Sequence, residues 1–295
     1  MKYNKHIMII LILTHLCFTP CLSKAFFLIP DTTLAHSFSE QANAFHAKSQ
    51  YDSANKYLEK ASAIYEKAAA QYDELIMWSR YIQCINKMGD NLQVQGKYQD
   101  AMIYFNKALD TGLRELGENH VDIASLYNSI GVIYLYDGDY NRTLEYFEKA
   151  MTIRIQILGE NHLEVAGSYN NMGIIFERMG KYDTALQYYH KALRIKSHVL
   201  GEQHPKVADK YTSIGILYFS KGDYDTSLEF DNKALAIRLK SLGLDHPKVA
   251  FTYYCIGTKY YHKGYFDKAL EYCKKSVVTY LKTLNENHFR ISESY

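Results

Sequence analysis

Five histidines recur at a spacing of 42 residues, and histidine is the side chain most often used for metal binding and for acid–base chemistry near neutral pH. They are His120, His162, His204, His246 and His288. Equal spacing predicts that each lies at the same place in a repeated unit, so neighbours are at least one helix-packing distance of about 8–10 Å apart. Imidazoles that share a zinc ion must each lie about 2.1 Å from it. We therefore expect no metal site here, and interpret each histidine as closing the linker before a helix.

Other chemistry-bearing patterns are missing from the sequence. It contains no HExxH, no GxSxG, no phosphate loop and no dinucleotide fingerprint. Cys84, Cys255 and Cys273 form neither a CxxC pair nor a cluster with histidine at zinc-ligand spacing. Cys255 and Cys273 fall in the two helices of one unit, so both small buried side chains and a disulfide fit their positions. We predict a protein that is not an enzyme and that has no cofactor and no metal.

The charge and composition of the chain argue against a protein that binds nucleic acid or an anionic membrane. The chain has 34 Lys and Arg against 32 Asp and Glu, so its net charge is close to zero. A balanced chain lacks the basic excess that attracts nucleic acid or an anionic membrane. Only four prolines in 295 residues favour an all-helical protein. We expect a protein or peptide partner, no nucleic acid, and membrane attachment only through the N-terminal leader.

A 42-residue repeat sets the elements that position these residues. The stretch 161–201 overlies its neighbours on both sides when it is shifted by 42 residues. One glycine recurs inside the first helix of each unit, where the lack of a Cβ atom lets the paired helix approach. A second glycine recurs where that helix should end in a left-handed cap. The pattern predicts antiparallel helix pairs at about 34–73, 74–117, 118–159, 160–201, 202–243 and 244–285, and a partial unit at 286–295.

The helix ends carry further periodic residues. An Asn, Gln or Asp precedes the first helix of each unit and is the predicted N-cap: Asn119, Asn161, Gln203, Asp245 and Asn287. Pro205 and Pro247 fit the first turn, where the missing N–H costs nothing. A basic residue also recurs late in the second helix, as Arg154, Lys196 and Arg238. We expect this basic column on the outer face, beside the helix C-termini, with a basic docking stripe as the alternative.

The residues of the fourth unit carry a family resemblance. Its repeated positions are held by Tyr169, Met172, Gly173, Phe176, Ala185, Tyr189 and Ala192. This pattern resembles the tetratricopeptide repeat. Ser197 stands where that repeat usually has a helix-ending proline, so the second helix runs on. With YNNMG, KALRIK and the LGxxHPxVA linker, the chain is similar to the kinesin light chain subclass. Over residues 34–295 the resemblance implies an all-α fold, a right-handed α-solenoid of antiparallel helix pairs.

The resemblance also implies where a ligand would bind. In this family the first helix of each pair lines the concave groove, and the position after its first aromatic residue faces that groove. The corresponding residues here are Asn86, Asn128, Asn170, Thr212 and Tyr254, with Asn171, Arg178 and Tyr261 nearby. An asparagine ladder offers donors and acceptors that can hold an extended peptide backbone; the alternative is a row of solvated helix-face residues. The predicted function is a protein–protein interaction scaffold that binds a peptide or helix of a partner in the concave groove.

One subsite of the family does not transfer to this sequence. Some members hold a C-terminal carboxylate with a Lys/Asn clamp. The asparagine positions of that clamp are occupied here by Asp90, Val132, Ile174 and Ile216. A role as a receptor for a chaperone tail is therefore not expected.

The N-terminal segment predicts export. A basic residue pair lies within positions 1–6, an apolar run covers 7–18, and Pro20 and Ser23 precede a predicted cleavage point. The apolar run is shorter than the roughly 20 residues of a membrane-spanning helix, although an uncleaved anchor is the alternative. We expect a signal peptide at 1–23, a linker at 24–33, and a periplasmic, cell-envelope or secreted location.

The repeat pattern breaks off within a predicted helix at 286–295. The alternative function is therefore an exported sensory or regulatory region of a larger signalling protein or peptidase.

Overall fold

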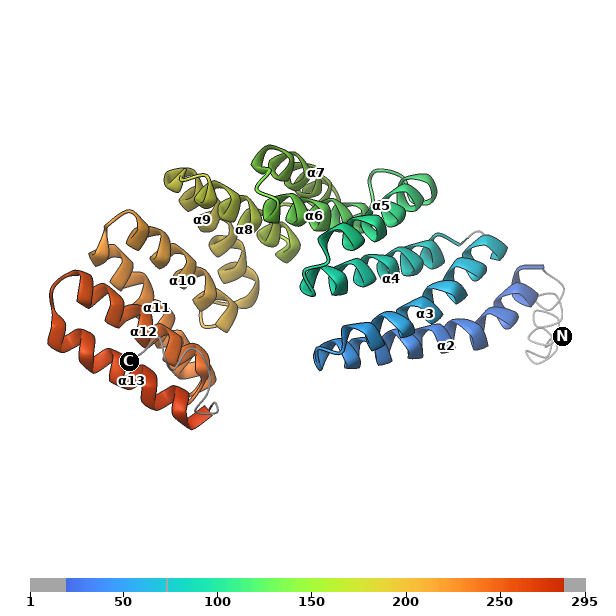
Figure 1. Cartoon of the computed structure of the whole chain (residues 1–295). Coiled ribbons are helices and arrows are strands. Elements are labelled where there is room, and N and C mark those ends of the chain that lie inside the picture. Colours follow the sequence, from blue (N-terminus) through green and yellow to red (C-terminus); the bar gives the residue numbers. More distant parts are fainter. Residues whose placement is uncertain (1–19, 73, 284–295) are drawn as a thin grey trace, which may run out of the picture. The chain divides into compact units, whose positions relative to one another are not determined.

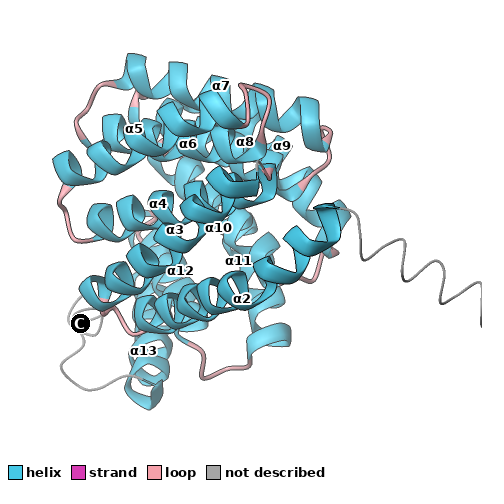
Figure 2. Cartoon of the chain, turned by 90° about the vertical axis from the view of Figure 1, so that its right-hand side faces the viewer, coloured by secondary structure: helices cyan, strands magenta, loops and turns pink. Residues whose placement is uncertain are grey.

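The described residues of the computed structural model, 20–72 and 74–283, form helices joined by short turns and contain no strand (Figures 1 and 2). The helices are α2 (Pro20–Ala47), α3 (Tyr51–Tyr72), α4 (Leu75–Val94), α5 (Tyr98–Glu115), α6 (Val121–Tyr136), α7 (Tyr140–Leu158), α8 (Leu163–Arg178), α9 (Tyr182–Leu200), α10 (Pro205–Ser220), α11 (Tyr224–Leu242), α12 (Pro247–His262) and α13 (Phe266–Thr283). None of these helices is both long enough and apolar enough to cross a bilayer.

Two compact units divide the chain, and the boundary between Ile153 and Arg154 falls inside α7. In the first unit α2 packs on α3, and α4 on α5 (Figure 1). In the second unit the packed pairs are α8 with α9, α10 with α11, and α12 with α13. The predicted all-α fold of stacked antiparallel helix pairs is confirmed.

Glycine allows the two helices of a pair to touch. A Cβ atom placed on Gly173 of α8 would lie 2.4 Å from the ring of Tyr189 on α9. Gly89 of α4 has the same relationship to Phe105 on α5, also at 2.4 Å. Real Cβ atoms do not come this close to a ring, so the predicted role of these glycines in close helix approach is confirmed.

The helix termini confirm one prediction and correct another. Gly180 follows α8 with a φ of +72°, as expected of a left-handed glycine cap. Gly201 ends α9 with a φ of +84° and a ψ of 148°, an extended conformation with positive φ that favours glycine. The N-cap of α8 is His162, and the predicted Asn161 lies one residue earlier. The Nδ1 atom of His162 accepts a hydrogen bond of 3.2 Å from the backbone N–H of Glu164. Histidine Nδ1 can accept this capping hydrogen bond because, like the Oδ1 atom of an asparagine cap, it is bonded directly to Cγ.

The same arrangement recurs along the chain. His120, His204 and His246 cap α6, α10 and α12 through hydrogen bonds of 3.2, 3.1 and 3.1 Å. The predicted N-caps Asn119, Gln203 and Asp245 are therefore corrected in the same way, whereas Asn287 and His288 lie outside the described residues. Pro205 and Pro247 begin α10 and α12, as predicted. The histidine column thus closes the linkers by capping.

The basic column does not lie on the outer face. Arg238 of α11 is only 3% exposed. Its guanidinium donates to Asp209 of α10 at 2.8 Å and to Thr252 of α12 at 2.6 Å. Arg154 is likewise buried and donates to Ser168 of α8 at 2.9 Å. The prediction of an exposed column is wrong for Arg154 and Arg238, because the first helix of the next unit covers each of them. Lys196 is half-buried.

The predicted leader at 1–23 lies outside the described residues except for its last four positions, where α2 begins. Residues 24–33 are part of α2, where the sequence analysis expects a linker. A proline inside a helix, such as Pro30, removes one hydrogen bond at a cost of about 3 kcal/mol but does not by itself end the helix.

The three cysteines outside the leader are not paired in the described part of the chain. Cys84 and Cys255 are buried, Cys273 is half-buried, and no disulfide joins them.

Candidate functional site

In the first unit, two of the predicted groove residues lie on the first helices of their pairs. Asn86 on α4 and Asn128 on α6 are both half-buried. The Oδ1 atom of Asn86 is fully buried and has no hydrogen-bond partner among the described residues. A buried amide oxygen without a partner is costly, and it is not placed where a ligand backbone in solvent could reach it.

In the second unit, Asn170 and Asn171 of α8 are part of a polar cluster between two repeats. The Oδ1 atom of Asn170 accepts a hydrogen bond from Lys210 of α10, and its amide donates to Asn171 at 3.4 Å. Lys210 is 8% exposed, and its ammonium lies 5.6 Å from the centre of the Tyr189 ring. Burial lowers the pKa of Lys210 to about 8. Asn170 therefore satisfies a buried ammonium rather than standing free.

The remaining predicted residues differ from one another. Thr212 is buried, and its hydroxyl donates to the carbonyl of Ala208 at 3.1 Å. This side chain is covered because α10 packs closely on its neighbours at this point. Tyr254 is half-buried, and Arg178 and Tyr261 are exposed. The predicted column therefore does not form a uniform ladder of exposed amides.

Tyr261 belongs to a group that we call the C-terminal aromatic patch, made of Tyr261, Tyr265, Phe266 and Leu270. These side chains are 60%, 53%, 63% and 55% exposed. The rings of Tyr261 and Phe266 have centroids 5.6 Å apart, and Leu270 follows Phe266 by one helical turn on α13. Several large apolar side chains exposed together on a soluble protein mark an interaction surface.

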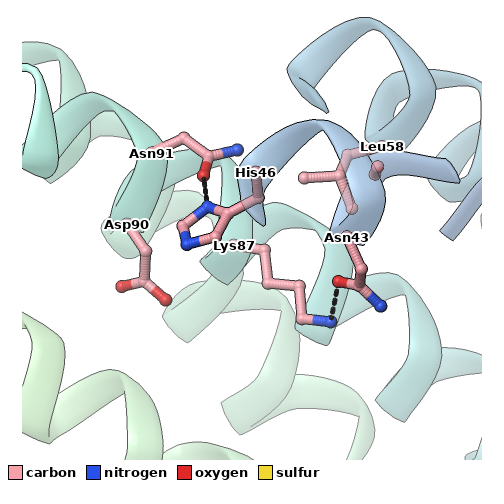
Figure 3. Close-up of a pocket in the computed structure, with 7 residues that line it drawn as sticks. Asn43, His46, Leu58, Lys87, Asp90 and Asn91 are labelled. Carbon is pink, nitrogen blue, oxygen red and sulfur yellow. Dashed lines mark hydrogen bonds between the residues drawn. The ribbon is translucent and has the colours of Figure 1, made fainter. Parts of the chain in front are cut away.

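A pocket of about 180 Å³ lies in the first unit between α2, α3 and α4 (Figure 3). Ala42 and Leu58 supply its apolar wall, and its polar lining comes from Asn43, His46, Lys87, Asp90 and Asn91. We call it the α2–α4 pocket. Its volume is several times the roughly 30 Å³ that one water occupies, so the space is large enough for part of a ligand.

Hydrogen bonds hold one side of this pocket in a fixed arrangement. His46 Nδ1 lies 2.6 Å from Asn91 Oδ1, and Asn91 Nδ2 donates to Asn55 Oδ1 at 2.6 Å. Asn91 is only 2% exposed, and these two hydrogen bonds hold both ends of its amide inside the protein. At the outer side, Lys87 Nζ donates to Asn43 Oδ1 at 3.1 Å.

Asp90 is the acidic group of the pocket. Within the described part of the chain it receives one hydrogen bond, from the Ser129 hydroxyl at 3.4 Å. Burial raises the pKa of Asp90 to about 6, although Ser129, His46 and Lys87 each favour the ionised form. A carboxylate with so few donors around it retains the capacity to accept hydrogen bonds from a ligand.

The 42-residue pattern does not by itself predict this pocket, but a departure from the pattern lies at its centre. Asp90 and Asn91 stand where three later units carry apolar pairs: Val132 with Ile133, Ile174 with Ile175, and Ile216 with Leu217. The last described unit departs from this pattern as well, with Thr258 and Lys259. Polar residues at positions that build the core in the three middle units are the departure that marks the site.

Metal ligands do not gather in the part of the chain that the structure describes: no three His, Cys, Asp or Glu side chains are placed to hold an ion.

Comparison with known proteins covers most of the chain. A family model described as tetratricopeptide repeat matches residues 81–156, 122–198, 164–240 and 206–282. No curated protein matches the sequence. The crystal structure of BtubC (BKLC) from P. vanneervenii is similar with a TM-score of 0.69 at 25% identity, covering 79% of this chain and 92% of that one.

Two further structures share the fold. A putative kinesin light chain from Podosopora anserina, with nearly identical TPR-like repeats, has a TM-score of 0.61 at 17% identity and covers 70% of this chain and 97% of that one. The Rap conjugation gene regulator of plasmid pLS20, solved in complex with the Phr* peptide, has a TM-score of 0.58 at 20% identity and covers 89% of this chain and 65% of that one.

Proposed function

Because this chain belongs to the tetratricopeptide repeat family, we propose that it is a protein–protein interaction scaffold that binds a peptide or a helix of a partner protein. The residues that repeat every 42 positions pack and cap the helices. Recognition is left to side chains that differ between units and reach the surface.

The observation that carries the proposal is the C-terminal aromatic patch. Aromatic side chains provide much of the binding energy at protein interfaces, because a large rigid surface is buried at little cost in side-chain entropy. Tyr261 and Phe266 present two such rings in contact with each other. A partner segment with apolar side chains at helical or extended spacing would cover both rings.

Fold neighbours support a peptide ligand. The Rap regulator that shares this fold was solved with a bound peptide. At 20% identity this likeness concerns the fold, and it supports the class of ligand without specifying which residues here would contact it.

Site-specific crosslinking tests the proposal. A photo-crosslinking amino acid at position 261 should capture a defined partner in native cells, and the same amino acid at position 103 should not. Ile103 is a matched control because it is 66% exposed but lies outside the patch. Phe266→Ala should reduce capture from position 261 at least tenfold. Equal capture from both positions, or capture unaffected by Phe266→Ala, would contradict the proposal.

We further propose that the chain is exported, on the sequence of residues 1–23 alone. N-terminal sequencing of the protein from the envelope or the medium should begin near Ser23 or Ala25, whereas a product that starts at Met1 would contradict cleavage. The alternative role, as a regulatory region of a larger protein, predicts a native product well above 34.2 kDa on a denaturing gel.

A further inference from the structure

We propose that the α2–α4 pocket binds a primary ammonium group of the partner, supplied either by a lysine side chain or by a free peptide N-terminus. The inference rests on the proposed scaffold function, since the ammonium would belong to the bound segment. It concerns a surface of the first unit that lies outside the predicted asparagine column.

The hydrogen-bond chain fixes which atoms face the pocket. A carbonyl oxygen can only accept, so the 2.6 Å contact to Asn91 Oδ1 places the hydrogen of the neutral His46 ring on Nδ1. Asn91 is held in this orientation because its Nδ2 donates to Asn55. In the neutral ring the other nitrogen of His46, Nε2, carries a lone pair and can accept a hydrogen bond. Figure 3 shows this nitrogen on the side of the ring towards Asp90.

Asp90 supplies the charge. Its carboxylate and His46 Nε2 are both acceptors, and the described structure has no ion pair between them. An ammonium group placed between them would donate to both and would neutralise a carboxylate that is largely withdrawn from water. An anionic group in the same place would face the Asp90 charge and two sets of lone pairs, so the inner end of the pocket selects a cation.

The rim of the α2–α4 pocket favours a ligand whose amine is followed by a carbonyl or a carboxylate group. Lys87 is exposed, and its ammonium is held at the rim by Asn43. It has two further N–H donors for a carbonyl or carboxylate that follows the ligand amine. Because Lys87 is in solvent, its charge is screened more strongly than that of Asp90, and its repulsion of a cation deeper in the pocket is weak.

Comparison between repeats shows that a polar residue at these positions needs a partner. At the position of Asn91 three later units have Ile133, Ile175 and Leu217, each 2% exposed or less, and the last described unit has Lys259, which is also buried but is paired with Asp231 at 3.0 Å. An apolar pair therefore packs well at this point of the fold, and a polar pair is costly to bury unless it is satisfied. A bound ammonium would supply the donors that Asp90 lacks.

The test uses the full chain, labelled with ¹⁵N, and follows the Nε2 resonance of His46, assigned by its loss in His46→Gln. Three probes are compared: Nα-acetyl-lysine N-methylamide, glycine N-methylamide, and the neutral Nα,Nε-diacetyl-lysine N-methylamide. At least one ammonium probe should shift the resonance saturably, and the neutral probe should not. A response to the lysine probe alone identifies a side chain as the source, and a response to the glycine probe alone identifies a free N-terminus.

Two variants at one position control for folding. Asp90→Asn should weaken binding of the ammonium probe at least tenfold, while Asp110→Asn, at an exposed acid on α5, should leave it unchanged. Asp90→Val copies Val132 of the next unit, so it should unfold at the same or a higher urea concentration and lose binding. No response to either ammonium probe, an equal response to the neutral probe, or unchanged binding by folded Asp90→Val would overturn the inference. None of these outcomes bears on crosslinking at position 261.

Discussion

The ring of Tyr189 on α9 lies against Gly173 on α8 so closely that a Cβ atom at position 173 would come within 2.4 Å of it. Tyr189 is 2% exposed, and its hydroxyl donates to Glu177 at 2.6 Å, so the ring cannot move aside freely. This contact fixes the distance between the two helices of the pair.

We expect Gly173→Ala to lower the free energy of unfolding by about 1–3 kcal/mol, because overpacking outweighs the gain of about 1 kcal/mol in helix propensity. Gly167→Ala is the matched control in the same helix, since nothing lies within 4 Å of a Cβ atom there. It should raise the free energy of unfolding by about 0.5–1 kcal/mol. Urea denaturation followed by circular dichroism measures both, and destabilisation of equal size in the two variants would refute the packing explanation.

Capping by histidine gives a second prediction. His162→Ala should destabilise the chain by about 0.5–2 kcal/mol, because the Glu164 N–H loses its acceptor, while His162→Asn should retain most of the stability. Asn161→Ala, at the residue expected to be the cap, should have little effect. Thermal unfolding of the three variants at neutral pH checks this, and a larger effect at position 161 than at 162 would restore the sequence-based assignment.

A buried ion pair gives a third prediction. Asp231 on α11 and Lys259 on α12 are 0% and 3% exposed, with Lys259 Nζ 3.0 Å from Asp231 Oδ2. Burial raises the pKa of Asp231 in spite of Lys259. Lys259→Leu alone should cost about 3–5 kcal/mol by leaving an unpaired buried charge.

A double variant of Asp231 and Lys259 distinguishes the contribution of the ion pair to stability from that of apolar packing. Asp231→Phe with Lys259→Leu installs residue types found at the equivalent positions of other units, Phe147 for Asp231 and Leu217 for Lys259. It should be as stable as the wild type or more stable by about 1–4 kcal/mol. Urea denaturation of the single and double variants completes the cycle. If the double variant were as unstable as the single one, the pair would have to be explained by something other than charge burial.

The pKa of Asp90 predicts how stability changes with pH. Its folded-state pKa of about 6 lies above the ordinary value of 3.8, so the folded chain binds more protons than the unfolded chain between these values. Stability should therefore fall as pH rises from about 4 to about 6, by up to about 3 kcal/mol at roughly 1.4 kcal/mol per pKa unit. His46, Lys87 and Ser129 surround the carboxyl and keep the shift from being larger.

The measurement is the difference in unfolding free energy between wild type and Asp90→Asn at several pH values. The variant should lack this component, so the difference should shrink as pH falls from about 6 to about 4 and then stay nearly constant. Binding of the ammonium probe should follow the opposite course and weaken as pH falls below about 6. A difference that is constant over this range would show that Asp90 titrates normally.

Much of the fold could be predicted from the sequence, because a residue that recurs every 42 positions must satisfy the same local constraint each time. The contact of Gly173 with a ring and the left-handed cap at Gly180 depend on neighbours within one helix pair, and both were predictable. The family could be predicted for the same reason, since its motif is a list of such packing residues. The cap at His162 was missed by one residue because asparagine is the commoner capping residue and stands next to it.

The candidate site depended on partners one repeat apart. His46 meets Asn91 across 45 residues, and Lys210 meets Asn170 across 40. Which side chains face each other across that distance is decided by how one pair stacks on the next, and a period does not encode it. The sequence by itself determined the repeated helix pairs, through glycine, aromatic and capping positions. Only the tertiary structure brought the exceptions to the pattern together, because Asp90, Asn91 and His46 form a pocket only when α2 and α4 pack side by side.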